Sequence, residues 1–307
     1  MKSTARKLWI AMALLCALLF TTRAARAEVT VVATVPSLAA IAREIGGQRV
    51  KVTSLALPTQ DPHFVDAKPS LALDLNKADL LLAVGLDLEV GWLPVLQTGA
   101  RNPKIQPGSQ GFLDCSTLVT RLDVPQQPVD RSMGDVHAGG NPHYLYDPRA
   151  AASVARGIAA RLGDLDPGRR AEYQASLEAF QKRLDGARAG WEQRLAKHRG
   201  APVLAYHKSW VYLTGWLGLK EIEHIEPKPG IPPNPAHVAR VLVATRQHGA
   251  RAILQESYYP DQTARLIAQK SGAKLVVLPG GADFRAGQSY VDHIEQMVAL
   301  LEQGLGG

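Results

Sequence analysis

Cysteine is nearly absent from this 307-residue chain, which contains two, Cys16 and Cys115. Cys16 lies in an N-terminal segment that we expect to be removed on export, so the mature chain keeps Cys115 alone. One cysteine cannot form an intramolecular disulfide, and it cannot supply the several thiolates of a cysteine-based zinc or iron–sulfur site. The fold must therefore be stabilised by its core, and His, Asp or Glu must hold any bound metal.

The apolar run near the N-terminus is too short for a membrane span. It covers 13 residues, from Leu8 to Phe20, whereas a bilayer requires roughly 20. Three basic residues precede it and an A-x-A sequence at residues 25–27 follows it, which is the layout of a cleavable secretory signal. We expect a periplasmic protein that begins at Glu28. Because Cys16 follows a leucine rather than a small residue, a lipid anchor is disfavoured.

Excess positive charge is also missing once this segment is set aside. The whole chain carries +7, but five of its 35 Lys and Arg residues, and none of its 28 acidic residues, lie in residues 1–27. The mature chain therefore has 30 basic against 28 acidic residues, a net charge of +2. This balance gives little support to a nucleic acid or another polyanion as partner.

Strand and helix patterns alternate through the remaining 280 residues, a length that suits two domains of roughly 100 to 150 residues. In the first half we expect strands at 29–34, 50–57 and 79–84 and helices at 37–45 and 69–78. In the second half we expect strands at 202–206, 251–255 and 274–278 and helices at 236–248, 261–270 and 290–305. This alternation predicts an α/β fold with mostly parallel sheets covered by helices.

A long helix is predicted between the two halves, from Asp166 to Arg199. Its apolar residues recur at spacings of three, four or seven: Tyr173, Leu177, Phe180, Leu184, Trp191 and Leu195. A helix of about 32 residues is roughly 48 Å long, so we interpret it as a backbone that links two lobes; an ordinary surface helix is the alternative. Gly186 and Gly190 either weaken it or mark close packing. The predicted division is a signal at 1–27, lobes at 28–163 and 201–307, and the linking helix at 164–200.

Three of the nine histidines occupy distinctive positions. His63 and His143 each follow a proline and precede an aromatic residue, and His207 directly follows the strand at 202–206. Ligands of open α/β sheets bind beyond the carboxyl ends of the strands, and a proline restricts the backbone beside each of the first two imidazoles. Neutral imidazole is a good ligand for zinc, copper, nickel and iron. The pattern indicates a metal site, although spacing alone does not establish proximity.

Two nearby carboxylates are candidates to orient these imidazoles through the second ring nitrogen. Asp66 follows His63 by three residues, and Asp147 follows His143 by four. Asp147 is equally well explained as the cap of a helix that begins at Pro148. The stretch from Val124 to Pro142 is rich in Pro, Gly and Asp and is predicted to be a long surface loop, functional or mobile.

Four motifs together resemble the metal-binding family of ABC-transporter solute-binding proteins. They are Asp-Pro-His-Phe at 61–64, Gly-Asn-Pro-His-Tyr-Leu-Tyr-Asp-Pro at 140–148, Tyr-His-Lys-Ser-Trp at 206–210 and Glu-Pro-Lys-Pro-Gly at 226–230. The resemblance covers essentially the whole mature chain and implies two Rossmann-like lobes, joined by one long helix, that hold one Zn²⁺ or Mn²⁺ in the interlobe cleft. It also implies that His63, His143 and His207 are metal ligands. Manganese-binding members commonly have a carboxylate where His207 stands, so zinc is expected and Mn²⁺ is the less favoured ion.

The fourth ligand is where the sequence departs from the family pattern. Many members place an aspartate just after the last strand, but here Pro279-Gly280-Gly281-Ala282 intervenes before Asp283. Glu256, after the strand at 251–255, is the other protein candidate, and water is a third. The loop before His143 is a short version of a longer His- and Asp-rich loop in many zinc-specific relatives. We interpret its His137 as an exposed residue, with transient ligation as the alternative.

Together these features predict a monomeric binding protein, not an enzyme, which captures a divalent transition metal and delivers it to the permease of an ABC importer in the inner membrane. A metallochaperone is a further possible partner. A zinc hydrolase using the same histidines is the main alternative, but the chain lacks His-Glu-x-x-His, Gly-x-Ser-x-Gly and Walker A motifs. An adhesin role, attributed to some relatives, is another alternative.

Overall fold

The computed structural model describes residues 28–130, 133–134 and 136–306. The predicted export signal at residues 1–27 lies outside this part of the chain. Within the described residues, no helix combines the length and the apolar character that crossing a membrane requires.

The N-terminal half forms a four-stranded parallel sheet in the order β2-β1-β3-β4. Its strands are β1 Val29–Ala33, β2 Val50–Ser54, β3 Leu80–Ala83 and β4 Phe112–Asp114, and its longer helices are α2 Pro36–Gly46, α3 Pro69–Asn76, α4 Leu93–Ala100 and α5 Pro148–Leu165. The central strands are buried on both faces, as parallel strands covered by helices usually are: Val31 and Val32 of β1 are almost inaccessible to solvent.

The C-terminal half repeats this arrangement in the order β6-β5-β7-β8, again entirely parallel. Its strands are β5 Pro202–Ala205, β6 Lys220–His224, β7 Ala252–Glu256 and β8 Lys274–Leu278, and its helices are α7 Val211–Leu217, α8 Pro235–Gln247, α9 Gln262–Ser271 and α10 Tyr290–Leu305. The predicted fold class is therefore confirmed. In both sheets the strand order reverses beside the first strand, which is where ligands of such sheets bind.

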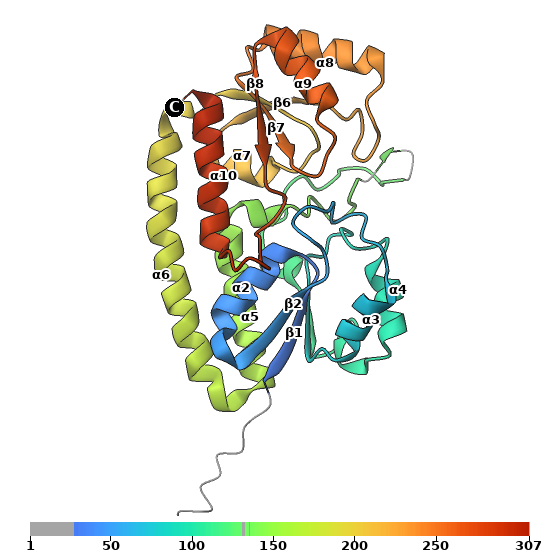
Figure 1. Cartoon of the computed structure of the whole chain (residues 1–307), viewed down its shortest axis with the longest axis vertical. Coiled ribbons are helices and arrows are strands. Elements are labelled where there is room, and N and C mark those ends of the chain that lie inside the picture. Colours follow the sequence, from blue (N-terminus) through green and yellow to red (C-terminus); the bar gives the residue numbers. More distant parts are fainter. Residues whose placement is uncertain (1–27, 131–132, 135, 307) are drawn as a thin grey trace, which may run out of the picture.

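The long helix has the predicted position and buried face. Its regular part is α6 Arg170–Leu195, extended by 3₁₀ turns at Pro167–Arg169 and Ala196–His198. The six predicted apolar residues are those that α6 buries. It packs against α2 and α5 of the first half and α10 of the second, and Figure 1 shows it running along both lobes. A Cβ added at Gly186 or Gly190 would meet no atom within 4 Å, so neither glycine marks close packing.

The two lobes share a core as well as this helix. One continuous cluster of buried apolar residues includes Val31 and Leu38 from the first lobe and Val203, Leu254 and Leu301 from the second. The lobes therefore meet through packed apolar surface. The division of the chain at residues 163 and 200 stays a prediction.

Polar contacts reinforce this junction near the start of α10. The Arg43 guanidinium of α2 donates to the carbonyl oxygens of Phe284 and Gln288 at 3.0 and 2.8 Å, and it lies over the Phe284 ring. The Tyr290 hydroxyl donates to the Leu145 carbonyl oxygen at 2.8 Å. The second lobe is thus held to the first at α2 and at the turn before α5, as well as along α6.

Candidate metal centre

Three histidines from distant parts of the chain meet between the lobes. One ligand-type nitrogen from each of His63, His143 and His207 lies within 4.8 Å of the others, and the ring centroids are 5.3 to 5.5 Å apart. All three side chains are buried, with exposed fractions of 8%, 8% and 3% respectively. Three imidazoles packed this closely away from solvent form a site for a divalent metal ion.

His63 is held in the loop after β2 by a carboxylate just before it. The carboxylate of Asp61 lies 2.7 Å from Nδ1 of His63 and also accepts the backbone N–H of His63 at 3.0 Å. This contact directs Nε2 toward the other histidines. The prediction that Asp66 orients His63 is wrong, because the Asp66 side chain is 80% exposed and lies 3.7 Å from Lys68 instead.

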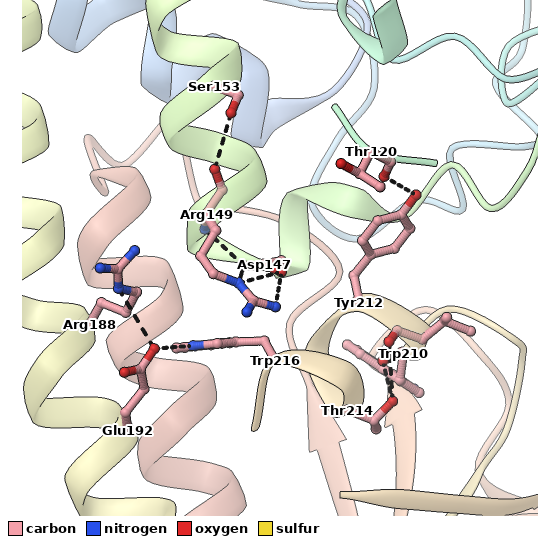
Figure 2. A network of polar contacts seen from close by, with 11 residues as sticks. Thr120, Asp147, Arg149, Ser153, Arg188, Glu192, Trp210, Tyr212, Thr214 and Trp216 are labelled. Carbon is pink, nitrogen blue, oxygen red and sulfur yellow. Dashed lines mark hydrogen bonds and ion pairs between the residues drawn. The ribbon is translucent and has the colours of Figure 1, made fainter. Parts of the chain in front are cut away.

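His143 lies at the start of a 3₁₀ turn, Tyr144–Tyr146, and its backbone N–H donates to Oδ1 of Asn141 at 3.0 Å. Its Nε2 has no hydrogen-bond partner among the described residues. Asp147 does not orient this imidazole. Its carboxylate caps α5 through the Arg149 N–H at 2.8 Å and pairs with the Arg149 guanidinium, as Figure 2 shows. Of the two interpretations of Asp147, the helix cap is confirmed.

His207 follows β5, and a carboxylate distant in sequence orients its ring. Oε2 of Glu226 lies 2.7 Å from Nδ1 of His207 and accepts the Gly230 N–H at 3.1 Å. Both side chains of the pair are buried. Glu226 belongs to the Glu-Pro-Lys-Pro-Gly motif used for the resemblance, but sequence reasoning assigned it no role, because 19 residues separate it from His207.

Burial favours the neutral form of two of these imidazoles, those of His143 and His207. It lowers the pKa of His143 well below the ordinary value, and the neighbouring His63 and His207 add to this effect. Burial likewise lowers the pKa of His207, although Glu226 opposes the shift. Because only a neutral imidazole has a lone pair free for a metal, the site is prepared to bind a cation near neutral pH.

A fourth histidine, His137, approaches the cluster from the long loop. Its Nε2 lies 3.2 Å from Nε2 of His63 and the two rings are stacked. Burial and the nearby histidines lower the pKa of His137 to about 3. The interpretation of His137 as an exposed loop residue is therefore wrong. Its position in an aperiodic loop, with no proline before it, is why the sequence did not distinguish it.

The two carboxylates considered as fourth ligand behave differently from the histidines. Glu256, the last residue of β7, is fully buried, and burial raises its pKa to about 8. Asp283 is exposed, and its Oδ1 accepts the Ala286 N–H at 3.1 Å. Among the residues that the structure describes, no carboxylate joins the three histidines at ligand spacing. The structure thus does not bring Asp283 to the centre and leaves Glu256 outside the cluster.

Two parallel sheets with a buried histidine cluster between them define a two-lobed metal-binding protein. Residues 31–304 match the family described as zinc-uptake complex component A, periplasmic. The chain belongs to this family, so the resemblance inferred from the four motifs is confirmed. A component of an uptake complex binds its solute rather than transforming it, and the prediction that the chain is not an enzyme is confirmed with it.

Curated relatives are distant in sequence. The chain is 23% identical to the "High-affinity zinc uptake system protein ZnuA" of Yersinia pestis over 306 residues, which cover 94% of this chain and 95% of that one. It is 24% identical to the protein of the same name from Brucella abortus over 146 residues, 47% of this chain and 44% of that one. The chain thus matches less than half the length of the Brucella relative. The "Iron-binding protein YfeA" of Yersinia pestis is 22% identical over 290 residues, 90% of this chain and 86% of that one.

Solved structures share the fold. A crystal structure of ZnuA superposes with a TM-score of 0.76 at 21% identity, covering 91% of this chain and all of that one. A cadmium-bound periplasmic metal-binding protein from Candidatus Liberibacter asiaticus gives 0.75 at 20% identity, with coverage of 91% and 100%. The laminin-binding adhesin Lmb from Streptococcus agalactiae gives 0.73 at 23% identity, with coverage of 91% and 99%.

Proposed function

We propose that this protein captures one Zn²⁺ in the periplasm through His63, His143 and His207 and delivers it to the membrane permease of an ABC importer. The observation that carries the proposal is the buried cluster of these three imidazoles between the two lobes. A site built from both lobes couples the bound ion to their relative position, which suits a carrier that must later release its cargo.

The choice of zinc follows from the donor atoms. The cluster offers imidazole nitrogen, with no carboxylate at ligand spacing among the described residues. Nitrogen donors suit zinc, whereas Mn²⁺ prefers carboxylate, carbonyl and water oxygens. Relatives of this chain have names that refer to zinc, iron and manganese, so the donor set, not the fold, supports zinc here.

We propose His137 as the fourth ligand in place of Glu256, Asp283 or water. Its Nε2 already faces Nε2 of His63, and two ligands of one zinc ion lie at about this separation when each Zn–N bond is about 2.0 to 2.1 Å. His137 also lines both a cavity of about 740 Å³ beside His63 and one of about 110 Å³ beside His143 and His207. The cluster at ligand spacing comprises His63, His143 and His207, so the His137 ring must move closer to His143 and His207 to complete the coordination of the ion.

Metal binding by the purified mature chain tests the proposal. We expect one zinc per chain and a clear preference for Zn²⁺ over Mn²⁺ in competition with a chromophoric chelator. Loss of a partner behind a metal ligand typically weakens binding about 10- to 100-fold, so replacing a ligand, as in His63→Ala, His143→Ala or His207→Ala, should weaken it by more than about 100-fold. His137→Ala should cost less, because water can replace a ligand at the mouth of the site.

His248→Ala is the matched control, because His248 is an exposed residue at the end of α8. It should leave the zinc affinity unchanged. Equal losses for His248→Ala and His207→Ala, or a preference for Mn²⁺, would contradict the assignment of the site or of the metal.

We propose that residues 1–27 are removed on export, that the mature chain is a monomer, and that it exchanges metal with the importer and with a metallochaperone. Mass spectrometry of the chain recovered from the periplasm tests the cleavage site: a first residue other than Glu28 would contradict it. A mature chain that sediments as a dimer would contradict the monomer.

A further inference from the structure

The candidate metal centre has ligands on both sides of the boundary between the lobes. His63 and His143 belong to the first lobe, whereas His207 follows β5 of the second. Zinc–nitrogen bonds of about 2.0 to 2.1 Å tolerate little error in the position of the imidazoles. Groups that are not themselves ligands must therefore fix the relative position of the two lobes close to the ion.

One buried side chain, that of Asn141, spans this boundary. Its Oδ1 accepts the backbone N–H of His143 at 3.0 Å, and its Nδ2 donates to the carbonyl oxygen of Lys208 at 2.7 Å. The side chain is 6% exposed. Only one orientation of the amide satisfies both contacts, since the oxygen must face an N–H and the nitrogen must face a carbonyl. A single amide thus joins the backbone of one histidine to the residue directly after another.

Neighbouring contacts make the same connection less directly. The Asn141 N–H donates to the Leu122 carbonyl oxygen at 2.9 Å, and the Leu122 N–H donates to the Tyr212 hydroxyl at 2.9 Å. That hydroxyl donates in turn to the Thr120 carbonyl oxygen at 3.2 Å, as Figure 2 shows. The loop that contains residues 120–123 therefore lies between Asn141 and the segment that follows His207.

An exposed ion pair also crosses the boundary between the lobes: the Lys208 ammonium lies 2.6 Å from the Asp123 carboxylate. Exposed pairs of this kind contribute little energy. The buried amide is different: removing it leaves the N–H of His143 and the carbonyl of Lys208 without their partner, and an unpaired buried backbone group is costly. Loss of the Asn141 side chain would therefore affect both the segment that contains His143 and the segment that contains His207.

We infer that Asn141 is a positioning residue of the metal centre, which sets the distance between His143 and His207 by bridging their backbones across the lobes. The inference rests on the proposed function, because the centre must bind a metal for the distance to matter. It assigns Asn141 no contact with the ion.

The chain offers a closely matched control in Asn102. This asparagine is also 6% exposed, and its Oδ1 likewise accepts the N–H two residues ahead, that of Lys104, at 3.0 Å. Its Nδ2 donates to the carbonyl oxygens of Leu75 and Ala78 at 2.9 and 2.8 Å. All these contacts lie within the first lobe. Asn102→Ala therefore removes a comparable buried amide without touching the boundary.

The test compares Asn141→Ala, Asn141→Ser and Asn102→Ala in the full mature chain. Zinc affinity is measured by chelator competition, and the geometry of the centre by the visible absorption of bound Co²⁺, which is intense only in near-tetrahedral sites. We expect Asn141→Ala to weaken zinc binding about 10- to 100-fold, as for other groups that hold a ligand in place, and to alter the Co²⁺ spectrum. Asn102→Ala should lower thermal stability and leave both metal readouts unchanged.

Asn141→Ser separates the two halves of the bridge. A serine hydroxyl can still accept the His143 N–H, as in the related turn of Ser and Thr residues, but it is too short to reach Lys208. We expect this variant to bind metal as weakly as Asn141→Ala. Wild-type affinity and an unaltered spectrum in either Asn141 variant would overturn the inference, as would an equal loss in Asn102→Ala. Failure of the unaltered chain to bind zinc would instead overturn the proposed function.

Discussion

The histidines of the centre differ in how their rings are held. His63 and His207 each present Nδ1 to a carboxylate, Asp61 and Glu226, at 2.7 Å. A carboxylate behind an imidazole fixes the orientation of the ring and makes the other nitrogen a better ligand. His143 has no such partner within the described residues and is positioned by its backbone and by burial. At the scale of single residues, the centre therefore depends on groups behind the ligands as much as on the ligands.

Removing the charge behind His207 tests this dependence. Glu226→Gln should weaken zinc binding about 10- to 100-fold, because an amide is a poorer acceptor for the Nδ1–H and can also point its nitrogen at the ring. Chelator competition measures the change. Glu221→Gln is the control. The Glu221 carboxylate lies 3.2 Å from Nε2 of His224, a histidine that is not part of the centre. An unchanged affinity in Glu226→Gln would show that the carboxylate does not act on the metal.

His293 on α10 is 1% exposed and has no hydrogen-bond partner for either ring nitrogen in the described part of the chain. Burial lowers its pKa from 6.5 to about 4. As the pH falls from 6.5 to 4, the unfolded chain therefore takes up a proton that the folded chain does not. Across that window the folded protein should lose up to about 3 kcal/mol of stability through this group.

Urea unfolding of the metal-free protein between pH 7 and pH 4.5 measures this loss. His293→Leu should flatten the dependence of the unfolding free energy on pH, because leucine does not titrate. His248→Leu, at an exposed position, should leave the slope as it is. If His293→Leu retained the full slope, the acid sensitivity would have to come from other groups.

Among the elements, the long helix α6 combines a buried apolar face with two glycines that lower its stability. Gly186 and Gly190 lie within its regular part, and neither has an atom within 4 Å of an added Cβ. Glycine in a helix interior costs about 0.5 to 1 kcal/mol relative to alanine, mainly through the freedom of the unfolded backbone. Here nothing in the packing offsets that cost.

Gly186→Ala and Gly190→Ala should therefore each stabilise the protein by about 0.5 to 1 kcal/mol. The midpoint of chemical unfolding measures the gain. Gly157→Ala in α5 is the contrasting variant, because its Cβ would run into the side chain of Leu118. It should give a smaller gain or a loss. Equal gains at all three positions would mean that helix propensity alone decides, without regard to packing.

The packing of the whole molecule opposes a large separation of the lobes, although a small shift between them would still change the distances between the metal ligands. The lobes share the continuous apolar cluster, and both α6 and the start of α10 contact each of them. Separating the lobes would expose packed apolar surface, which is strongly unfavourable. Figure 1 shows α6 running along one side of both lobes, with α10 beside its upper part.

Metal binding should accordingly displace the backbone by about 1 Å or less, as in other preorganised proteins, and leave the radius of gyration nearly unchanged. Small-angle X-ray scattering of the metal-free and zinc-loaded chain measures this. In the loop that includes His137, amide hydrogen exchange should become slower when zinc is bound. A contraction of several ångströms would show that the lobes close as hinged bodies.

The sequence by itself determined the fold class, most element positions and the three histidines, because each depends on a local pattern. Apolar periodicity located strands such as β8 and the face of α6, and the Pro-His-aromatic setting distinguished His63 and His143. The same reasoning did not predict α4, α7, β4 or β6, although α4 is as long as the predicted α3 and β6 is as long as the predicted β8. Strand or helix identity in so few residues is decided more by tertiary packing than by intrinsic preference.

Only the tertiary structure decided which groups surround the histidines. It selected Asp61 over Asp66, brought Glu226 and His137 to the centre and left Asp283 exposed in a turn outside the histidine cluster. Each of these outcomes depends on the direction of a side chain or on the distance between segments far apart in sequence. Such distances arise when the lobes pack against each other, and no periodicity along the chain records them.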